Sequence, residues 1–523
     1  MTEARKLRMG LSGRCTRVAL VAAAIVMVPT SAAAKKPPPQ PPPGGGFSST
    51  STYVKNYANV VDGVELDLTP RAVQATTDGG WVTLATTQAV PNGVEVAWLL
   101  KASAVGAPQW QEAVGCLSNP PGDYSDPVSL EPTSDGGYVL AGGMIGCGSG
   151  AVCPSLSGLQ CGLIDKLDST GRLVWARAYS ADVDGTTFDQ LRPTSDGGFI
   201  AVGSATDASQ RPGALIIKLD SAGNVEWQHE LGPTATSYAY FSSVEPTTDG
   251  GYVAAGEFND GTNSTYGLPL MSTLAAKFDA SGNLTWQHGF NDMGATGVSA
   301  VEHVNTIVQT ADGGYALGGD WDSDTSGPGE CCQGALLVKL TPSGSIDWQR
   351  AYSRGLECDN GGYGTPCRNI GGGVYSLHQT SDGGYLLAGD TNLEQFNGLV
   401  PWLAKTDGSG ALVWQKADYQ MNTTTGAPLS EYFASLALTP AGPIALGSTE
   451  NYSTLRDELL AVQTDANGTV GSCSQIHTGI LTAMDPALVA VTPGLTVRTS
   501  VATQTASPAQ TQSTSATATA SQC

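Results

Sequence analysis

The chain has 523 residues, including 66 glycines and 11 cysteines; only 14% are charged, and its formal net charge is −22. So acidic a protein is not expected to bind nucleic acid or an anionic membrane through its bulk electrostatic field. High glycine with little lysine and much serine and threonine favours a secreted all-β protein.

The first 34 residues have the pattern of a secretory signal peptide. Basic side chains precede the apolar run Val18–Val28, and Ala32–Ala34 offer a small-residue cleavage site. The run is too short to span a bilayer, so we expect no transmembrane segment. Loss of 1–34, with five basic residues and one acidic, takes the net charge from −22 to −26. Residues 35–50 follow as a Pro/Gly-rich linker. We expect a secreted protein, whether periplasmic, cell-surface or extracellular.

Residues 51–473 are dominated by one repeat. Its clearest copy runs Leu130-Glu-Pro-Thr-Ser-Asp-Gly-Gly-Tyr-Val-Leu-Ala-Gly142 and, after a loop, Leu163-Ile-Asp-Lys-Leu-Asp-Ser-Thr-Gly-Arg-Leu-Val-Trp-Ala-Arg-Ala-Tyr179. The first-half turn, Asp-Gly-Gly, starts at Asp78, Asp135, Asp196, Asp249, Asp312 and Asp382. The second half, Lys-x-Asp-x-x-Gly-x-x-x-Trp, ends at Trp110, Trp175, Trp227, Trp286, Trp348 and Trp414. A seventh copy is eroded, with Ala441 in place of the aspartate and Ser472 in place of the tryptophan.

The repeat predicts a seven-bladed β-propeller of four-stranded antiparallel blades, with almost no helix. Asp-Gly-Gly between apolar runs is typical of a hairpin turn, and the run from Tyr138 to Gly142 alternates as a strand does. About 60 residues per repeat suits four short strands with their loops. Tyr53-Val-Lys-Asn-Tyr57 has the spacing of Trp175 to Tyr179. We therefore expect this N-terminal strand to close the last blade, since a ring must hide its end strands.

Strand order predicts that the two sides of the ring differ. The Asp-Gly-Gly and Asp-x-x-Gly turns are the first and third turns of a blade, so they share one face. The second connection and the link between blades share the other face, and these vary in length. Loops on a rigid scaffold are where binding residues concentrate, so we expect the long-loop face to carry the function.

Ten cysteines remain after the signal peptide: Cys116, Cys147, Cys153, Cys161, Cys331, Cys332, Cys358, Cys367, Cys473 and Cys523. An even number in an exported protein favours disulfides, which would brace the long loops. Zinc is the competing interpretation, but no Cys-x-x-Cys pair occurs. The adjacent Cys331 and Cys332 either bond to each other or reach Cys358 and Cys367, and Cys473–Cys523 is the simplest closure of the last two. Connectivity is otherwise open.

The tail, residues 474–523, is rich in threonine, serine and alanine. Two interpretations stay open for it. The tail is either a disordered or glycosylated segment, or an extra strand pinned back by Cys523.

Two sets of residues are candidates for ligand binding. Asp320, Asp322 and Asp324 have the alternate spacing of a calcium loop, although Thr325 and Cys331 depart from the EF-hand pattern; a solvated acidic loop is the other interpretation. Calcium is therefore possible, and no other cofactor is expected. Aromatic rings beside carboxylates suit sugar rings, and the candidates on the long-loop face are Tyr240, Phe241, Trp321, Tyr363 and Tyr432. No Gly-x-Ser-x-Gly elbow, His-Glu-x-x-His motif or phosphate loop occurs, so we expect no catalytic residues.

These repeats resemble those of exported bacterial β-propeller proteins, and Leu167-Asp-Ser-Thr-Gly-Arg-Leu-Val-Trp175 resembles the tryptophan-docking motif of quinoprotein (PQQ-like) propellers. In quinoprotein alcohol dehydrogenases a vicinal disulfide covers the cofactor and a calcium ion lies beside it, so Cys331-Cys332 near Asp320 invites the comparison. Three departures oppose it: those enzymes usually have eight blades, these cysteines have other partners within reach, and the other repeats offer no matching set of cofactor ligands.

The sequence therefore favours a non-enzymatic binding or adhesion propeller, monomeric, that engages a protein or glycan through disulfide-braced loops. A PQQ- and calcium-dependent oxidoreductase and a structural cell-envelope protein are the alternatives.

Overall fold

The computed structural model contains strands and turns alone in the part of the chain that it describes. The described part is residues 52–470, except for 62–63, 90–93, 116–123, 146–160, 181–183, 207–210, 233–237, 264–268, 292–300, 325–330, 354–371, 393–398, 419–429 and 452–455, and seven short segments between 476 and 518. These residues include no helix, and hence none that could cross a membrane.

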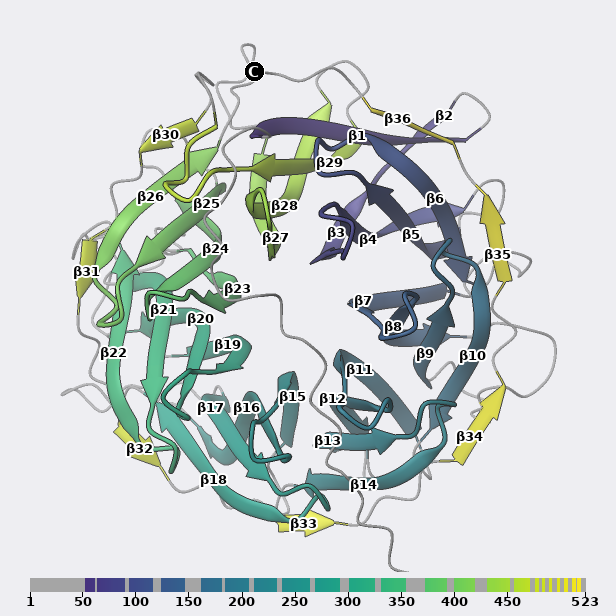
Figure 1. Cartoon of the computed structure of the whole chain (residues 1–523). Helices are drawn as coiled ribbons and strands as arrows, with labels where there is room; N and C mark the ends of the chain where they lie inside the picture. The colour runs from purple at the N-terminus through teal and green to yellow at the C-terminus, as the bar shows by residue number, and fades with distance from the viewer. Residues whose placement is uncertain are drawn as a thin grey trace, which may run out of the picture. The chain divides into compact units, whose positions relative to one another are not determined.

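Seven antiparallel blades of four strands form a ring, as predicted, and we number them one to seven in chain order (Figure 1). From the axis outward, blades one to three are β3 (Thr69–Ala75), β4 (Trp81–Ala89), β5 (Val94–Ala102), β6 (Pro108–Gly115); β7 (Tyr124–Pro132), β8 (Tyr138–Ile145), β9 (Cys161–Leu167), β10 (Leu173–Ser180); and β11 (Asp184–Pro193), β12 (Phe199–Thr206), β13 (Pro212–Leu219), β14 (Val225–Gly232).

Blades four to six are β15 (Tyr238–Pro246), β16 (Tyr252–Asn263), β17 (Pro269–Phe278), β18 (Leu284–Asn291); β19 (Val301–Gln309), β20 (Tyr315–Asp324), β21 (Cys331–Leu340), β22 (Ile346–Ser353); and β23 (Val374–Gln379), β24 (Tyr385–Asn392), β25 (Leu399–Thr406), β26 (Leu412–Asp418). Blade seven is β27 (Ser430–Thr439), β28 (Gly442–Asn451), β29 (Arg456–Gln463) and β1 (Tyr53–Val61), with β2 (Val64–Leu66) as a hairpin on β1.

The ring closes where the sequence predicted. β1 pairs antiparallel with β29, with Tyr53 opposite Gln463 and Tyr57 opposite Leu459. The outer strand of blade seven thus comes from the N-terminal end of the described chain, and its three inner strands come from residues 430–463. The first and last strands of the repeat region, β1 and β29, are therefore joined by backbone hydrogen bonds inside one sheet. Neither strand has an unpaired edge where the two meet.

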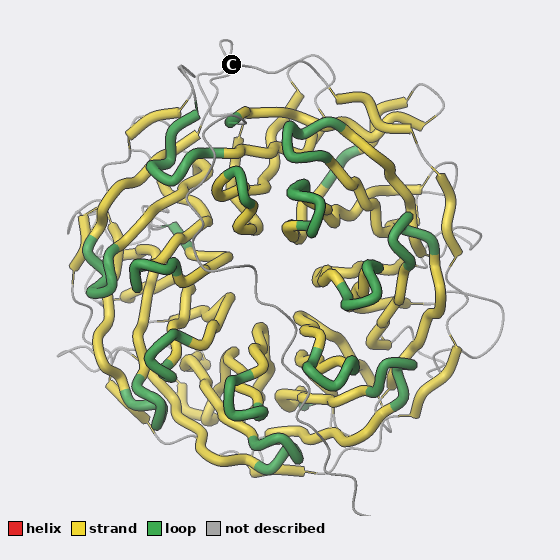
Figure 2. Tube along the Cα trace, viewed as in Figure 1, coloured by secondary structure: helices red, strands yellow, loops and turns green. Residues whose placement is uncertain are grey.

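The two short turns of each blade lie on one side of the ring, which we call the turn face (Figure 2). Both glycines of the Asp-Gly-Gly turn are needed, for different reasons. Gly136 has a φ of 83°, in the left-handed region that glycine favours. A β-carbon on Gly137 would lie 2.2 Å from the carbonyl oxygen of Leu167, a distance that backbone atoms cannot accommodate. The backbone conformation at the first glycine and the lack of space at the second explain why Gly-Gly recurs in this turn.

A buried lysine fastens the first turn to the third strand in six blades. The Nζ atom lies 2.9 to 3.1 Å from a carboxylate oxygen of the turn aspartate in the pairs Lys101–Asp78, Lys166–Asp135, Lys218–Asp196, Lys277–Asp249, Lys339–Asp312 and Lys405–Asp382. Blade seven has lost both partners together. Gln463 stands in place of the lysine, and its Nε2 donates to the carbonyl of Pro443 at 3.0 Å. The eroded copy thus avoids an unpaired buried charge.

The C-terminal tail adds one short fifth strand to every blade, in reverse order around the rim (Figure 1). The seven strands are β30 (Ile476–Thr478) on blade six, β31 (Thr482–Met484) on five, β32 (Val489–Val491) on four, β33 (Thr496–Arg498) on three, β34 (Thr503–Ala506) on two, β35 (Gln510–Ser513) on one and β36 (Ser515–Ala518) on β1 of blade seven. The tail segments therefore pair as strands around the whole ring, from blade six to blade seven.

Candidate functional site

The innermost strand of every blade carries a β-bulge at the same place. The pairing with the second strand skips one residue in each blade: Arg71, Val128, Asp189, Ser242, Asn305, Tyr375 and Ala434. Bulges re-aim side chains and are common beside binding sites. These seven residues differ in charge, size and polarity, although the backbone feature is the same in all seven blades.

The residue after the bulge has a structural role instead. In blade two, Ser129 Oγ accepts a hydrogen bond from the backbone N–H of Leu191 in blade three, at 3.1 Å. Equivalent bonds run from Ile307 N–H to Ser243 Oγ and from Leu436 N–H to Ser376 Oγ, at 3.0 and 3.1 Å. Serine stands at this joining position in four of the seven blades, whereas each of the neighbouring bulge positions has a different residue. Variation within a fixed frame is what a binding site built on repeats requires.

Five consecutive blades bring carboxylates, a histidine and tyrosines together along their first and second strands, away from the turn face. We call this set the axial arc, and it consists of Asp189, Tyr240, Glu257, His303, Asp320, Tyr375, Asp390 and Tyr432. Tyr240 and Glu257 are opposite each other across β15 and β16, and His303 and Asp320 across β19 and β20. The side chains of the arc therefore come from blades three to seven.

Glu257 lies at the middle of the arc and is only 3% exposed. Its Oε1 is 2.8 Å from Nδ1 of His303, in the next blade. Its Oε2 is buried and has no hydrogen-bond partner among the described residues. Burial raises the pKa of Tyr240, and the adjacent Glu257 carboxylate raises it further. The His303 side chain is 44% exposed, so solvent reaches this part of the arc.

Asp390 anchors the other end of the arc. Its Oδ1 accepts a hydrogen bond from the backbone N–H of Gly373 at 2.7 Å, and its Oδ2 accepts one from the Tyr375 hydroxyl at 3.1 Å. The carboxyl is buried, and burial raises its pKa to about 6 in spite of these two hydrogen bonds; the nearby Asp320 charge adds to the increase. The rings of Tyr375 and Tyr432 meet edge to face at 6.1 Å.

Three other carboxylates on the inner strands of blades two and four are met by arginines. Arg71 pairs with Asp126 at 2.9 Å. Arg192 is paired with Glu131 and lies 3.4 Å, through Nε, from Glu245. Burial raises the pKa of Glu245, and the Arg192 guanidinium opposes that increase. Ion pairs inside the chain therefore satisfy these three carboxylates.

The candidate aromatic residues of the sequence have different outcomes. Tyr240 and Tyr432 are half-buried members of the arc. Phe241 is fully buried and packs against Phe278 with ring centroids 6.2 Å apart, so it is a core residue and not a ligand contact. Alternation along β15 explains the difference, because adjacent residues of a strand face opposite sides. The side chain of Trp321 and the whole of Tyr363 lie outside the described residues.

The three aspartates with calcium-loop spacing lie in strand β20 instead of a loop. The side chains of Asp322 and Asp324 lie outside the described residues, so the calcium site stays a prediction. No group of three His, Cys, Asp or Glu side chains suited to a metal occurs within the described part of the chain.

The cysteines fall mainly outside the described residues. Cys161 begins β9, is buried and is disulfide-bonded. Cys331 and Cys332 begin β21, opposite Asp324 and Ser323. The pairing predicted for the ten cysteines, including Cys331 with Cys332 and Cys473 with Cys523, stays a prediction.

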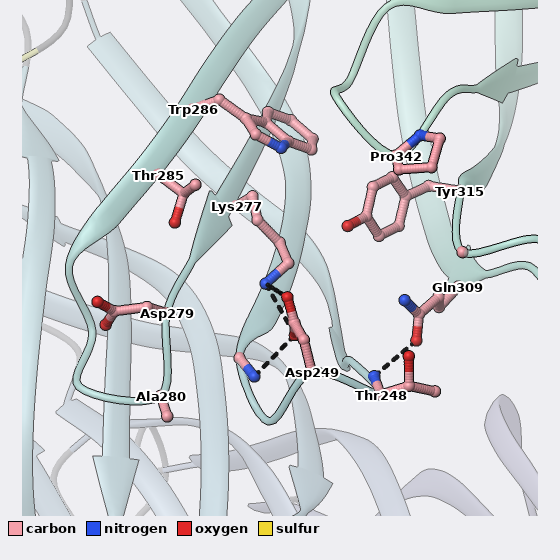
Figure 3. A pocket seen from close by; sticks show the side chains of 12 residues that line it. Thr248, Asp249, Lys277, Asp279, Ala280, Thr285, Trp286, Gln309, Tyr315 and Pro342 are labelled. Carbon is pink, nitrogen blue, oxygen red and sulfur yellow. Dashed lines mark hydrogen bonds and ion pairs between the residues drawn. The ribbon is translucent and has the colours of Figure 1, made fainter.

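A depression of about 360 Å³ lies on the turn face between blades four and five (Figure 3). Its lining includes the Lys277–Asp249 pair together with Trp286 and Tyr315, whose rings meet at 5.7 Å. The same lysine–aspartate pair recurs at the neighbouring junction as Lys218–Asp196. This depression is made of scaffold residues, which makes the axial arc the better candidate for a specific site.

No protein-family model and no curated protein matches the chain. Sqt1 of Chaetomium thermophilum is a similar solved structure, with a TM-score of 0.36 and 11% identity over 79% of this chain and 86% of that chain. The exotype rhamnogalacturonan lyase YesX gives 0.33 and 11% over 78% and 74%. A putative glycoside hydrolase of Parabacteroides distasonis ATCC 8503 gives 0.26 and 12% over 58% and 93%. Such scores carry no functional argument, and the resemblance to exported and quinoprotein propellers stays a prediction.

Proposed function

We propose that this chain is an exported, non-enzymatic binding propeller that engages a protein or glycan ligand at the side of the ring opposite the turn face. One observation supports this proposal most. The turn face repeats the same lysine, aspartate, glycine and tryptophan contacts from blade to blade, whereas the axial arc combines different charged and aromatic side chains on five blades. A surface that only held the ring together would need no such variety.

Export and disulfide bracing complete the proposal. The signal-like residues 1–34 would direct the chain out of the cytoplasm, where cysteines of the long connections oxidise to disulfides. Rigid connections around the arc would lose little conformational entropy when a ligand binds.

Protein and glycan arrays probed with the mature chain, residues 35–523, test the proposal. We expect capture of at least one ligand class, and we expect Tyr432→Ala to lower that capture. The control is Val174→Ala, an exposed residue of β10 outside the arc. Capture that falls only in variants of the turn face, or no capture at all, would contradict the proposal.

A further inference from the structure

We propose that the axial arc takes a cationic group, the guanidinium of an arginine or the ammonium of a lysine, presented by a protein partner. This inference rests on the proposed function and names the chemistry of its ligand. Asp126, Glu131 and Glu245, on the inner strands of blades two and four, are paired with arginines of this chain. The two buried carboxylates of the arc, Glu257 and Asp390, have no arginine among their hydrogen-bond partners in the described residues.

Glu257 provides the first step. Its carboxylate is 3% exposed, His303 Nδ1 lies 2.8 Å from Oε1, and the Tyr240 hydroxyl approaches the same carboxylate. Oε2 has no hydrogen-bond partner among the described residues. A buried acceptor without a partner costs about 1–3 kcal/mol, and more when it is charged. Few such acceptors occur in native proteins, and each calls for an explanation. The missing partner must be a hydrogen-bond donor, because an ionised carboxylate only accepts.

Asp189 and Asp390 provide the second step, because they favour a donor that is also a cation. Asp189 stands on the bulge of blade three and is exposed, so its carboxylate is open to a ligand. Asp390 is buried, with a pKa of about 6, and its partners are a backbone N–H and a phenol, neither of which carries a positive charge. A cation bound beside Asp390 would stabilise the ionised form of that carboxyl.

The tyrosines provide the third step. Tyr240, Tyr375 and Tyr432 place half-buried rings along the same arc. Aromatic faces attract guanidinium and ammonium groups, and arginine combines stacking with bidentate bonds to a carboxylate. The ring already contains such an arrangement, since Arg192 of blade three joins Glu131 of blade two and Glu245 of blade four. A partner's arginine would do for the arc what Arg192 does for blades two to four.

The test uses the mature chain and a matched pair of small probes. N-acetyl-arginine methylamide carries the guanidinium, and N-acetyl-citrulline methylamide is nearly isosteric and neutral. Binding is followed by calorimetry and by chemical-shift changes of the protein. The variants are Glu257→Gln and Asp390→Asn, with Asp189→Asn as an exposed position that is safer for folding. Asp279→Asn, an exposed carboxylate of a turn, removes the same charge elsewhere.

We expect the arginine probe to bind and the citrulline probe to bind at least tenfold more weakly. Each arc variant should weaken the arginine probe by about 10- to 100-fold, the range for a hydrogen bond to a charged group, and Asp279→Asn should leave it unchanged. Equal binding of the two probes, no binding of either, or equal losses in Asp279→Asn and the arc variants would overturn the inference.

The arrays separate failure of the inference from failure of the proposed function. Capture of neutral glycans that Glu257→Gln and Asp189→Asn abolish would leave the binding function in place and overturn the cationic ligand. Capture that no arc variant changes would overturn both. Capture of arginine- or lysine-rich peptides that falls in the arc variants alone would support both.

Discussion

The indole of Trp110 in blade one lies directly on Gly171 in blade two, so close that a β-carbon at Gly171 would be 2.6 Å from Cζ3 of the ring. The same tryptophan–glycine contact joins Trp175 to Gly223 and continues to Trp414 and Gly468. At the seam Tyr53 takes the place of the tryptophan on Gly106. An aromatic ring on a glycine therefore joins each blade to the next around the whole ring. We expect the packing at these junctions to contribute much of the stability of the fold.

Substitution of Gly171 tests that contact. Gly136 is a matched control, because both residues have a φ of 83° but nothing lies within 4 Å of a β-carbon at Gly136. Gly136→Ala should cost about 1–2 kcal/mol from its backbone conformation alone. Gly171→Ala should cost about 1–3 kcal/mol more, since the ring of Trp110 must move. Urea unfolding measures the difference, and equal costs would show that the junction is not tightly packed.

The second prediction concerns the buried lysine–aspartate pairs. Blade seven, which has glutamine and alanine at these two positions, suggests the substitutions. Asp312→Ala leaves the Lys339 ammonium, whose side chain is 5% exposed, without its carboxylate. We expect a loss of about 2–4 kcal/mol, toward the lower end because Asp312 itself is exposed. Lys339→Gln should cost less, and the double variant, which copies blade seven, should be no less stable than Asp312→Ala. Additive losses in the double-mutant cycle would contradict coupling between the two residues.

The strands of the ring and its closure could be predicted because their signals are local. Asp-Gly-Gly turns and alternating residues recur, and Tyr53–Tyr57 has the spacing of an outer strand. The strands of the tail could not be predicted from sequence, because its Thr/Ser/Ala composition has no repeat. The outer strands of the blades determine where each tail strand pairs. The axial arc was missed for another reason. Glu257, Asp320 and Asp390 each come eight residues after the aspartate of an Asp-Gly-Gly turn, so aligned repeats contain the signal of an acidic column in three successive blades. Its contacts with His303 and Tyr375 needed the structure.

Asp165 gives a prediction about pH. It is 1% exposed in β9, its Oδ1 has no hydrogen-bond partner among the described residues, and burial raises its pKa to about 7. The folded state then keeps a proton that the unfolded chain releases near pH 4, so stability should fall as pH rises from about 4 to 7 and level off above. A pKa that is about three units higher in the folded state corresponds to a decrease of roughly 4 kcal/mol in the free energy of unfolding across this pH range.

Substituting Asp165 should therefore stabilise the protein at neutral pH. The equivalent residues of blades three and five are Ile217 and Val338, so valine suits this position. We expect Asp165→Val to raise the free energy of unfolding at pH 8 and to flatten its dependence between pH 4 and 7. Asp168→Asn, at an exposed turn nearby, is the control. A pH profile that Asp165→Val leaves unchanged would show that Asp165 does not titrate in this window.

The tail strands make the last prediction, because the tail begins its pairing on blade six and ends it on blade seven. Strand β36 pairs with β1 from Tyr57 to Val60, next to the stretch of β1 that closes the ring on β29. If the tail stabilises ring closure, loss of β36 removes a strand that pairs with β1, the strand that closes the ring. Loss of β35 leaves the pairing of β36 with β1 in place. Both tail strands form four residue pairs, so they are a matched comparison.

We expect Ala516→Pro with Thr517→Pro to speed unfolding and proteolysis more than Thr511→Pro with Gln512→Pro, since proline removes the N–H that each pairing needs. Equal effects would mean that the tail covers the outer edges without closing the ring.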